Sequence, residues 1–319
     1  MASGPIITIA GAGSIGCFVG GLLTDTGHTV QFFGRKRIAI EIENNGLHLT
    51  DYSGMNVDLP YQQLHINEDA SLLSNADIVL VTVKSGATAE MADYILAHAN
   101  PKVVIVSLQN GVTNAAKLKE LLPRFDVRAG MVPFNVVHLG EGKFHRGTSG
   151  NIVMEAGNPD LSSTLSVPNL LIENANNMNE VLHGKLLVNL NNALNALSDL
   201  TLMQHLSDRY WRTRMAEHWE EGLKVMQAAH INPKPPSPVG ASIIPYILRL
   251  PTPLFKLIAK QMLTIDPQAR SSMWEDLQKG RTTEIDELQG EIIRLGKKHS
   301  VSTPINTETY NAIKALEQK

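Results

Sequence analysis

The chain of 319 residues lacks the features that mark several special classes of protein. Its single cysteine, Cys17, cannot form an intramolecular disulfide and fits a reducing compartment. The formal net charge is −3 and no run of Lys and Arg is longer than Arg35–Arg37, which argues against a nucleic-acid partner. No apolar stretch has the length of a membrane span, and the apolar segment Ile6–Leu23 contains recurring glycine and follows no basic residue, unlike a signal peptide. These absences predict a cytoplasmic protein with neither a nucleic-acid nor a membrane partner.

The first half of the chain alternates short apolar, β-branched runs with helical patterns, whereas the second half is helical in pattern throughout. The runs predict buried parallel strands at Ile6–Ala10, Val30–Phe33, Ile78–Val83 and Val103–Leu108. After about Asn176 the β-rich runs stop. We therefore predict an α/β fold, with a parallel-sheet domain over residues 1–176 and an all-helical domain over residues 177–319.

A proline-punctuated stretch interrupts the helical half between Asn232 and Pro267. Its two apolar runs, Ile243–Leu250 and Leu254–Met262, are separated by prolines and predict two short helices. Both runs are more apolar than ordinary surface helices. We expect their apolar faces to lie either across a homodimer interface or against the active site.

A glycine-rich turn, Gly11-Ala-Gly-Ser-Ile-Gly16, joins the first predicted strand to the helix-compatible run Cys17–Leu23. In this context glycines permit a tight turn and the close approach of a pyrophosphate, whose charge the helix N-terminus stabilises. The motif predicts a Rossmann-type dinucleotide site that includes Gly11, Gly13, Ser14, Ile15 and Gly16. The alternative is a glycine-rich turn that serves packing alone.

The end of the second predicted strand indicates which dinucleotide binds. NAD sites usually offer Asp or Glu there for the ribose 2′-hydroxyl, but this strand is followed by Gly34 and Arg35–Arg37. A guanidinium can pair bidentately with a 2′-phosphate, so we predict NADP(H), with Arg35 as its first ligand. The alternative is that these charges are solvated and begin the next helix.

Two further strand ends carry polar residues. Lys84 follows the third predicted strand and Asn110-Gly111 follows the fourth. In open α/β sheets ligands bind beyond the carboxyl ends of the strands, so both are candidate site residues. Either residue could also be a solvated strand end or a turn signal.

Lys185, Asn189 and Asn192 fall on one narrow stripe if the segment is a single helix, because each residue turns the helix by about 100°. Leucines cover the opposite side. Asparagine is a poor helix former, so two on one face need a reason beyond solubility. One amine and two amides could bind a small oxygen-rich molecule, although an ordinary polar helix face is the alternative.

These motifs resemble those of the ketopantoate (2-dehydropantoate) reductase family, from the first strand to Pro304. The C-terminal block is the most specific part, because its residues occur in order at the family's spacing. The matching segments are Gly11–Gly16, Val83–Lys84, Gln109–Gly111, Lys185–Asn189, Ser271–Asp276, Gly280–Asp286 and Gly290. The resemblance implies an NADPH-binding Rossmann domain followed by an all-helical domain, with ketopantoate bound in the cleft between them.

The resemblance also implies a role for each matching residue. Lys185 would be the general acid beside the keto oxygen, and Glu284 would lie close to the substrate, the lysine and the cofactor. Hydride arriving at a 2-keto carbon leaves an alkoxide, which an ammonium can stabilise and protonate. As an alternative for Glu284, it could belong to the first turn of a helix capped by Thr283. The binding residues would be Asn110 near nicotinamide and substrate, Asn189 and Asn192 at the substrate, Ser272 at its carboxylate, and Lys84 near the cofactor.

Two departures from the family pattern affect the substrate contacts. The usual second asparagine, eight residues after the lysine, is Ala193, and Asn192 is its candidate replacement. Ala269 stands where some members have asparagine. We therefore predict NADPH-dependent reduction of 2-dehydropantoate to (R)-pantoate for pantothenate and coenzyme A synthesis. The alternatives are reduction of another branched or bulkier 2-oxo acid and, in a different class, a dinucleotide-binding sensor without catalysis. No metal site is predicted.

Overall fold

The computed structural model describes residues 4–259 and 266–318. The chain divides into two compact units, Met1–Met178 and Asn179–Lys319. Within the described ranges, no helix is both long and apolar enough to cross a membrane.

The first unit is built on an eight-stranded, mainly parallel sheet, as predicted. The strand order is β12-β11-β8-β7-β6-β1-β2-β5, and only the β8–β11 pair is antiparallel. The four predicted strands are β1, β2, β6 and β7, of which β6 and β7 end slightly earlier than expected. The strands are β1 (Ile6–Ala10), β2 (Thr29–Phe33), β5 (His65–Asn67), β6 (Ile78–Val81), β7 (Val104–Ser107), β8 (Asp126–Met131), β11 (Ile152–Glu155) and β12 (Ile172–Ala175).

Helices connect these strands and cover the sheet. The core is formed by apolar strand residues such as Ile9 and Leu80, which are fully buried. The helices are α1 (Ser14–Asp25), α2 (Lys36–Asn45), α3 (Thr88–His98), α4 (Asn114–Leu121) and α5 (Leu161–Leu165), with 3₁₀ turns η1 (Tyr61–Gln63), η2 (Ala70–Leu73) and η3 (Ser85–Ala87).

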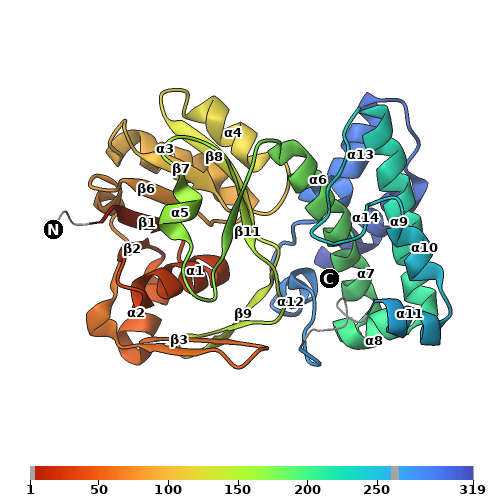
Figure 1. The fold of residues 1–319 in the computed structure, drawn as a ribbon, viewed down its shortest axis with the longest axis horizontal. Helices are drawn as coiled ribbons and strands as arrows, with labels where there is room; N and C mark the ends of the chain where they lie inside the picture. The colour runs from red at the N-terminus through yellow and green to blue at the C-terminus, as the bar shows by residue number, and fades with distance from the viewer. Residues whose placement is uncertain (1–3, 260–265, 319) are drawn as a thin grey trace. The chain divides into compact units, whose positions relative to one another are not determined.

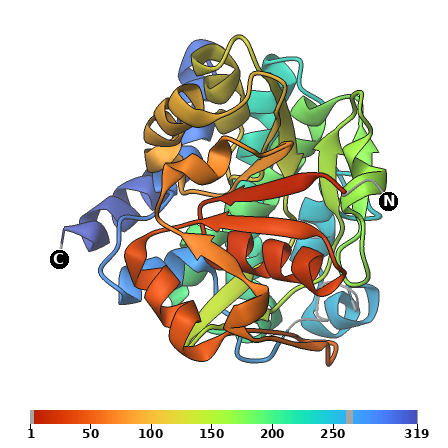
Figure 2. The ribbon, with the colours of Figure 1, turned by 90° about the vertical axis from the view of Figure 1, so that its left-hand side faces the viewer.

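A second, four-stranded sheet, which the sequence patterns do not predict, packs against the other side of α1 (Figure 1). Its order is β4-β3-β10-β9, formed by β3 (Leu47–Asp51), β4 (Asn56–Leu59), β9 (Val136–Gly140) and β10 (Lys143–Arg146). A Cβ on Gly21 would lie 2.7 Å from the side chains of Leu47 and of Leu49, so the helix and this sheet approach closely. Helix α1 is therefore a core element for both sheets, and Figure 2 shows it in red beside β1 and β2.

The second unit contains helices and loops, and no strand among its described residues. Its helices are α6 (Met178–Asn189), α7 (Asn191–Ser198), α8 (Leu202–Ser207), α9 (Arg209–Ala228), α10 (Ile244–Arg249), α11 (Thr252–Ile258), α12 (Ser272–Gln278), α13 (Gln289–Lys298) and α14 (Pro304–Glu317), with the 3₁₀ turn η5 (Ile285–Glu287). The single helix expected to carry Lys185, Asn189 and Asn192 is instead two helices, α6 and α7, which meet at Leu190.

The two short helices of the proline-punctuated stretch are α10 and α11, separated at Pro251 as predicted. The predicted second run continues to Met262, and its part from residue 260 lies outside the described residues. Both helices bury one face within their own chain, an arrangement that the sequence analysis does not consider. The fully buried guanidinium of Arg212 in α9 donates to the carbonyls of Leu206, Leu248 and Leu250 at 2.9–3.0 Å. The opposite faces expose five large apolar residues: Ile243, Tyr246, Leu254, Leu257 and Ile258.

Candidate active site

The glycine turn between β1 and α1 has the geometry that an anion requires. Gly11 has a φ of 117°, and a Cβ on Gly16 would lie 2.3 Å from the Gly11 carbonyl oxygen, so both positions need glycine for the chain's own packing. Gly13 is exposed at the N-cap of α1, where no side chain caps the helix and no acidic residue lies in the first turn. The N–H groups at this end are therefore available to a phosphate. These residues fit a pyrophosphate, and Ser14 and Ile15 supply the first-turn N–H groups.

The cationic cluster after β2 lies at the start of α2. Arg35 is the N-cap residue and is exposed, and Lys36 and Arg37 begin the helix. Arg37 reaches Glu41 at 3.6 Å, whereas no ion pair joins Arg35 to another residue within the described ranges. The first turn of α2 contains no acidic residue. This geometry fits a 2′-phosphate ligand role for Arg35, because its side chain is exposed. It equally fits solvated charges that begin the next helix.

Side-chain amides tie together the loops that carry Lys84 and Asn110. Gln109 Nε2 donates to the carbonyl of Val83 at 3.0 Å. Asn114 Nδ2 donates to the carbonyl of Asn110 at 2.6 Å and to Ser85 Oγ at 2.8 Å. Lys84 and Asn110 are exposed, so their positions depend on these buried amides. Neither role is predictable from the sequence, because a buried amide and a turn amide have the same local pattern.

Lys185 lies in α6 with a partly buried side chain. Burial lowers the pKa of its ammonium group to about 8. At pH 7 the amine therefore remains mostly protonated and is a stronger acid than an exposed lysine.

The asparagines of α6 and α7 divide into two groups. Asn191 and Asn195 are structural: Asn191 Oδ1 lies 2.9 Å from His205 Nε2, and Asn195 Nδ2 donates to the Leu200 carbonyl at 2.9 Å. Asn189 is 7% exposed, and no hydrogen bond joins its side chain, or that of Asn192, to another residue in the part of the chain that is described. The two predicted substrate asparagines thus keep amides that a ligand can use.

Ser272 begins α12, and its neighbour Ser271 holds that end of the helix against α7. Ser271 Oγ accepts from the N–H of Trp274 at 3.2 Å and donates to the carbonyl of Asn192 at 3.0 Å. The Ser271 N–H donates to Asn195 Oδ1 at 2.9 Å. The structure therefore links the segment of Ser272 to that of Asn192. Ser271 and Asn195 thus fix the start of α12 against α7, a role that their sequence positions do not predict.

Glu284 precedes the short turn η5 and is partly buried. Thr283 Oγ1 accepts from the N–H of Ile285 at 3.2 Å, but Glu284 itself is the N-cap of this 3₁₀ turn and no side chain caps it. The α-helix expected there, with Thr283 as its cap, begins only at Gln289. The Thr283 N–H donates to Glu317 Oε1 at 2.7 Å, which ties the segment to α14.

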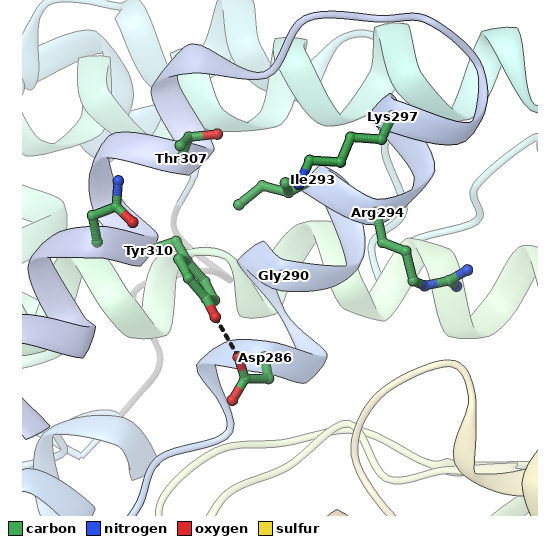
Figure 3. Close-up of a pocket in the computed structure, with 8 residues that line it drawn as sticks. Asp286, Gly290, Ile293, Arg294, Lys297, Thr307 and Tyr310 are labelled. Atoms are coloured by element: carbon green, nitrogen blue, oxygen red, sulfur yellow. Dashed lines mark hydrogen bonds between the residues drawn. The ribbon is translucent and has the colours of Figure 1, made fainter.

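An open pocket of about 390 Å³ lies between α13 and α14 (Figure 3). It contains none of the predicted site residues. At its base the Tyr310 hydroxyl donates to Asp286 at 2.6 Å, while Arg294 Nη2 pairs with Glu291 Oε1 at 2.5 Å. These polar groups already have partners within the chain. The full lining is Asp286, Gly290, Ile293, Arg294, Lys297, Thr307, Tyr310 and Asn311.

A Rossmann-type unit followed by a helical unit with a partly buried lysine, and with two amides that have no partner in the described chain, defines an oxidoreductase of the two-unit, dinucleotide-dependent class. Comparison with known sequences gives the family. The N-terminal profile described as "Ketopantoate reductase PanE/ApbA" matches residues 7–159, and its C-terminal counterpart matches residues 177–317. The chain belongs to the ketopantoate reductase family, whose members use NADPH.

Individual relatives agree with this placement. The 2-dehydropantoate 2-reductase of Archaeoglobus fulgidus is 26% identical over 98% of this chain and 97% of its own, and that of Halobacterium salinarum is 25% identical over 94% of each. The crystal structure of a PanE/ApbA family ketopantoate reductase from Ralstonia eutropha has 28% identity, a TM-score of 0.82 and 98% coverage of both chains. D-mandelate dehydrogenase, solved with NADH and anilino(oxo)acetate, shares the fold at 22% identity, a TM-score of 0.79 and 98% coverage of both chains.

The position of Arg35 predicts a preference for NADPH over NADH. A charge-assisted hydrogen bond to the 2′-phosphate contributes about 1.5–3 kcal/mol, which corresponds to roughly tenfold to more than a hundredfold in Kd. Arg35→Ala should remove most of that preference and leave NADH affinity unchanged, as measured by fluorescence titration. Equal affinities of the unmodified protein for the two cofactors would contradict this assignment.

The lowered pKa of Lys185 predicts the alkaline limb of the pH profile. An acid catalyst works in its protonated form, which is lost as the pH rises through about 8. We expect kcat/KM for reduction of a 2-oxo acid to be level near pH 7 and to fall about tenfold per pH unit well above pH 8. Reduction that stays level to pH 10 would show that this amine does not supply the proton.

Proposed function

We propose that the protein reduces 2-dehydropantoate to (R)-pantoate with NADPH, a step of pantothenate and coenzyme A synthesis. The observation that carries the proposal is the contrast among the asparagines: Asn191 and Asn195 have partners within the chain, whereas Asn189 and Asn192 keep amides for a ligand. Asparagine is a poor helix former, so a ligand gives these two amides a reason to be there. The names of the relatives support the same substrate at about 25% identity.

The mechanism assigns each group one task. Bound NADPH supplies a hydride to the keto carbon. Lys185 stabilises the negative charge that develops on the keto oxygen and then protonates it, a contribution of about 10²- to 10⁴-fold for acid catalysis. Glu284 would orient the ammonium and favour its charged form. Asn189 and Asn192 would bond the oxygen-rich substrate, with Ser272 at its carboxylate.

The cofactor would be held by the first unit. The turn Gly11–Gly16 and the uncapped N-terminus of α1 would bind the pyrophosphate, and Arg35 the 2′-phosphate. Lys84 and Asn110 would complete the nicotinamide side. We also propose a cytoplasmic location, because one cysteine leaves no internal disulfide for an oxidising compartment to form.

A bulkier 2-oxo acid is the second candidate substrate. Ala193 and Ala269 are both buried. By the family resemblance, Ala193 stands where asparagine is usual and Ala269 where some members have asparagine. Replacing an amide by a methyl group removes a polar contact and leaves space. This change favours a substrate with a larger or more apolar side chain.

A homodimer is part of the proposal. The exposed residues Ile243, Tyr246, Leu254, Leu257 and Ile258 lie on two adjacent helices, and exposed apolar groups of this size often mark an interface. Leu257→Glu should raise the dimer Kd at least tenfold, because burying a carboxylate in an apolar interface is costly. Light scattering across a concentration series measures this. An unmodified protein that is monomeric throughout would remove the dimer from the proposal.

Lys185→Ala tests the catalytic assignment. We expect kcat for the best 2-oxo acid to fall by about 10²- to 10⁴-fold, because the proton donor is lost, while the Kd for NADPH changes little. Steady-state NADPH oxidation should first be measured for the unmodified protein with a panel of 2-oxo acids, including 2-dehydropantoate.

Asn189→Ala is the companion variant. It should mainly raise KM, because it removes substrate binding and not the proton donor. An unmodified protein that binds NADPH and reduces no member of the panel would support the dinucleotide-binding sensor instead. A Lys185→Ala protein at the full rate would show that the lysine is structural.

A further inference from the structure

The side chain of Gln289 makes a single hydrogen bond within the described chain, and its acceptor lies where α6 and α7 meet. It is the first residue of α13 and its side chain is fully buried. Its Nε2 donates to the carbonyl oxygen of Leu190 at 2.8 Å, across 99 positions of sequence. Leu190 is the one residue between Asn189, where α6 ends, and Asn191, where α7 begins.

The break at Leu190 has no local cause in the sequence. Helices usually bend at proline, at glycine, or where a side chain enters the backbone hydrogen-bond ladder. No proline or glycine occurs between Lys185 and Ser198. Leu190 itself has ordinary helical angles, with φ −55° and ψ −27°. As the N-cap of α7, Leu190 has the carbonyl that accepts the first bond of that helix, and the Gln289 amide is a second donor to the same oxygen.

The same short segment carries Glu284. This segment is also tied to α14. Asp286 accepts from the Tyr310 hydroxyl at 2.6 Å (Figure 3) and from Lys314 Nζ at 2.7 Å. Gln289 adds the tie to Leu190. The segment of Glu284 is therefore held to α14 on one side and to the Lys185-bearing helix pair on the other.

Gln289 does not have the contacts of a residue kept for stability. Its Oε1 atom is buried and has no hydrogen-bond partner. An unpaired buried carbonyl costs free energy that offsets the gain from the Nε2 bond, so an apolar side chain of similar length would hold the core as well. A residue that is costly to bury and bonds at a helix junction beside two ligand amides fits a positioning role.

We infer that Gln289 is a positioning residue, which sets the junction of α6 and α7 and with it the spacing of Asn189 and Asn192 at the substrate. The inference rests on the proposed function for its consequence in catalysis. The bond at Leu190 and the resulting order of the junction do not depend on it.

Gln289→Met removes the donor and keeps the length of the side chain. We expect KM for the preferred 2-oxo acid to rise at least tenfold with a smaller change in kcat, because the binding amides shift while Lys185 stays on α6. The Kd for NADPH should change less than twofold, and Tm should not fall. KM within twofold of the unmodified value would overturn the inference, as would an equal loss of NADPH affinity.

Gln289→Glu tests whether a hydrogen-bond donor at this position restores substrate binding, which a merely structural role would not predict. Burial raises the pKa of a carboxyl group, and only its protonated form can donate to the Leu190 carbonyl. Relative to the unmodified protein at each pH, KM for this variant should recover as the pH falls from 8 to 5.5, whereas that of Gln289→Met should not. Parallel behaviour of the two variants counts against the inference.

Asn306→Leu is the matched control. Asn306 is also fully buried with an unpaired Oδ1, but its Nδ2 donates to Glu221 Oε1 at 2.8 Å, on α9. This variant should lower Tm and leave KM unchanged. A KM increase as large as that of Gln289→Met would mean that any lost buried amide disturbs the site.

Hydrogen exchange measures the order of the α6–α7 junction directly and does not require enzymatic activity. In Gln289→Met the backbone amides of residues 190–195 should exchange at least tenfold faster, with exchange in the first unit unchanged. If the unmodified protein reduces no 2-oxo acid, the proposed function fails and this measurement still decides the inference. Unchanged exchange at the junction would overturn it.

Discussion

The polar side chains enclosed in the helical unit must find hydrogen-bond partners, and this requirement separates structural asparagines from those available to a ligand. An unpaired buried amide costs about 1–3 kcal/mol. Asn191 and Asn195 meet the requirement through His205 and the Leu200 carbonyl. Asn189 has no such bond within the described ranges and is still 93% buried, since 7% of its surface is exposed. Its amide atoms are not among the fully buried unpaired ones, so they remain accessible to an oxygen-rich ligand.

Local patterns predicted much of the first unit and failed where structure depends on distant partners. The strands of the large sheet have apolar, β-branched runs such as Ile78–Val81, and the glycine turn has a spacing that few other structures require. The four-stranded sheet went unpredicted, because strands such as Leu47–Asp51 and Lys143–Arg146 are short and half polar. The bond from Gln289 to the carbonyl of Leu190, where α6 and α7 meet, also went unpredicted, since the two residues lie 99 positions apart.

The candidate site shows the same division. Residues that would touch substrate or cofactor, such as Lys185 and Arg35, could be proposed from residue type, spacing and family resemblance. The amides that bond the segments beside site residues could not. Gln109 and Asn114 reach Val83 and Ser85 near Lys84, and Gln289 reaches Leu190, in each case across more than twenty positions of sequence. Residues that contact a ligand can be proposed from residue type and spacing in the sequence. Residues that hydrogen-bond a distant backbone carbonyl can be identified only from the folded structure.

Helix α1 lies between the two sheets of the first unit, and its N-terminus is the end that we propose holds the pyrophosphate. Gly16 and Gly21 let it approach the strands on both sides. A partly folded chain that lacks the four-stranded sheet would leave one flank of α1 in water and its N–H groups poorly aligned. Affinity for the dinucleotide thus reports on completed folding. In the cell, cofactor abundance would select the fully folded form by mass action.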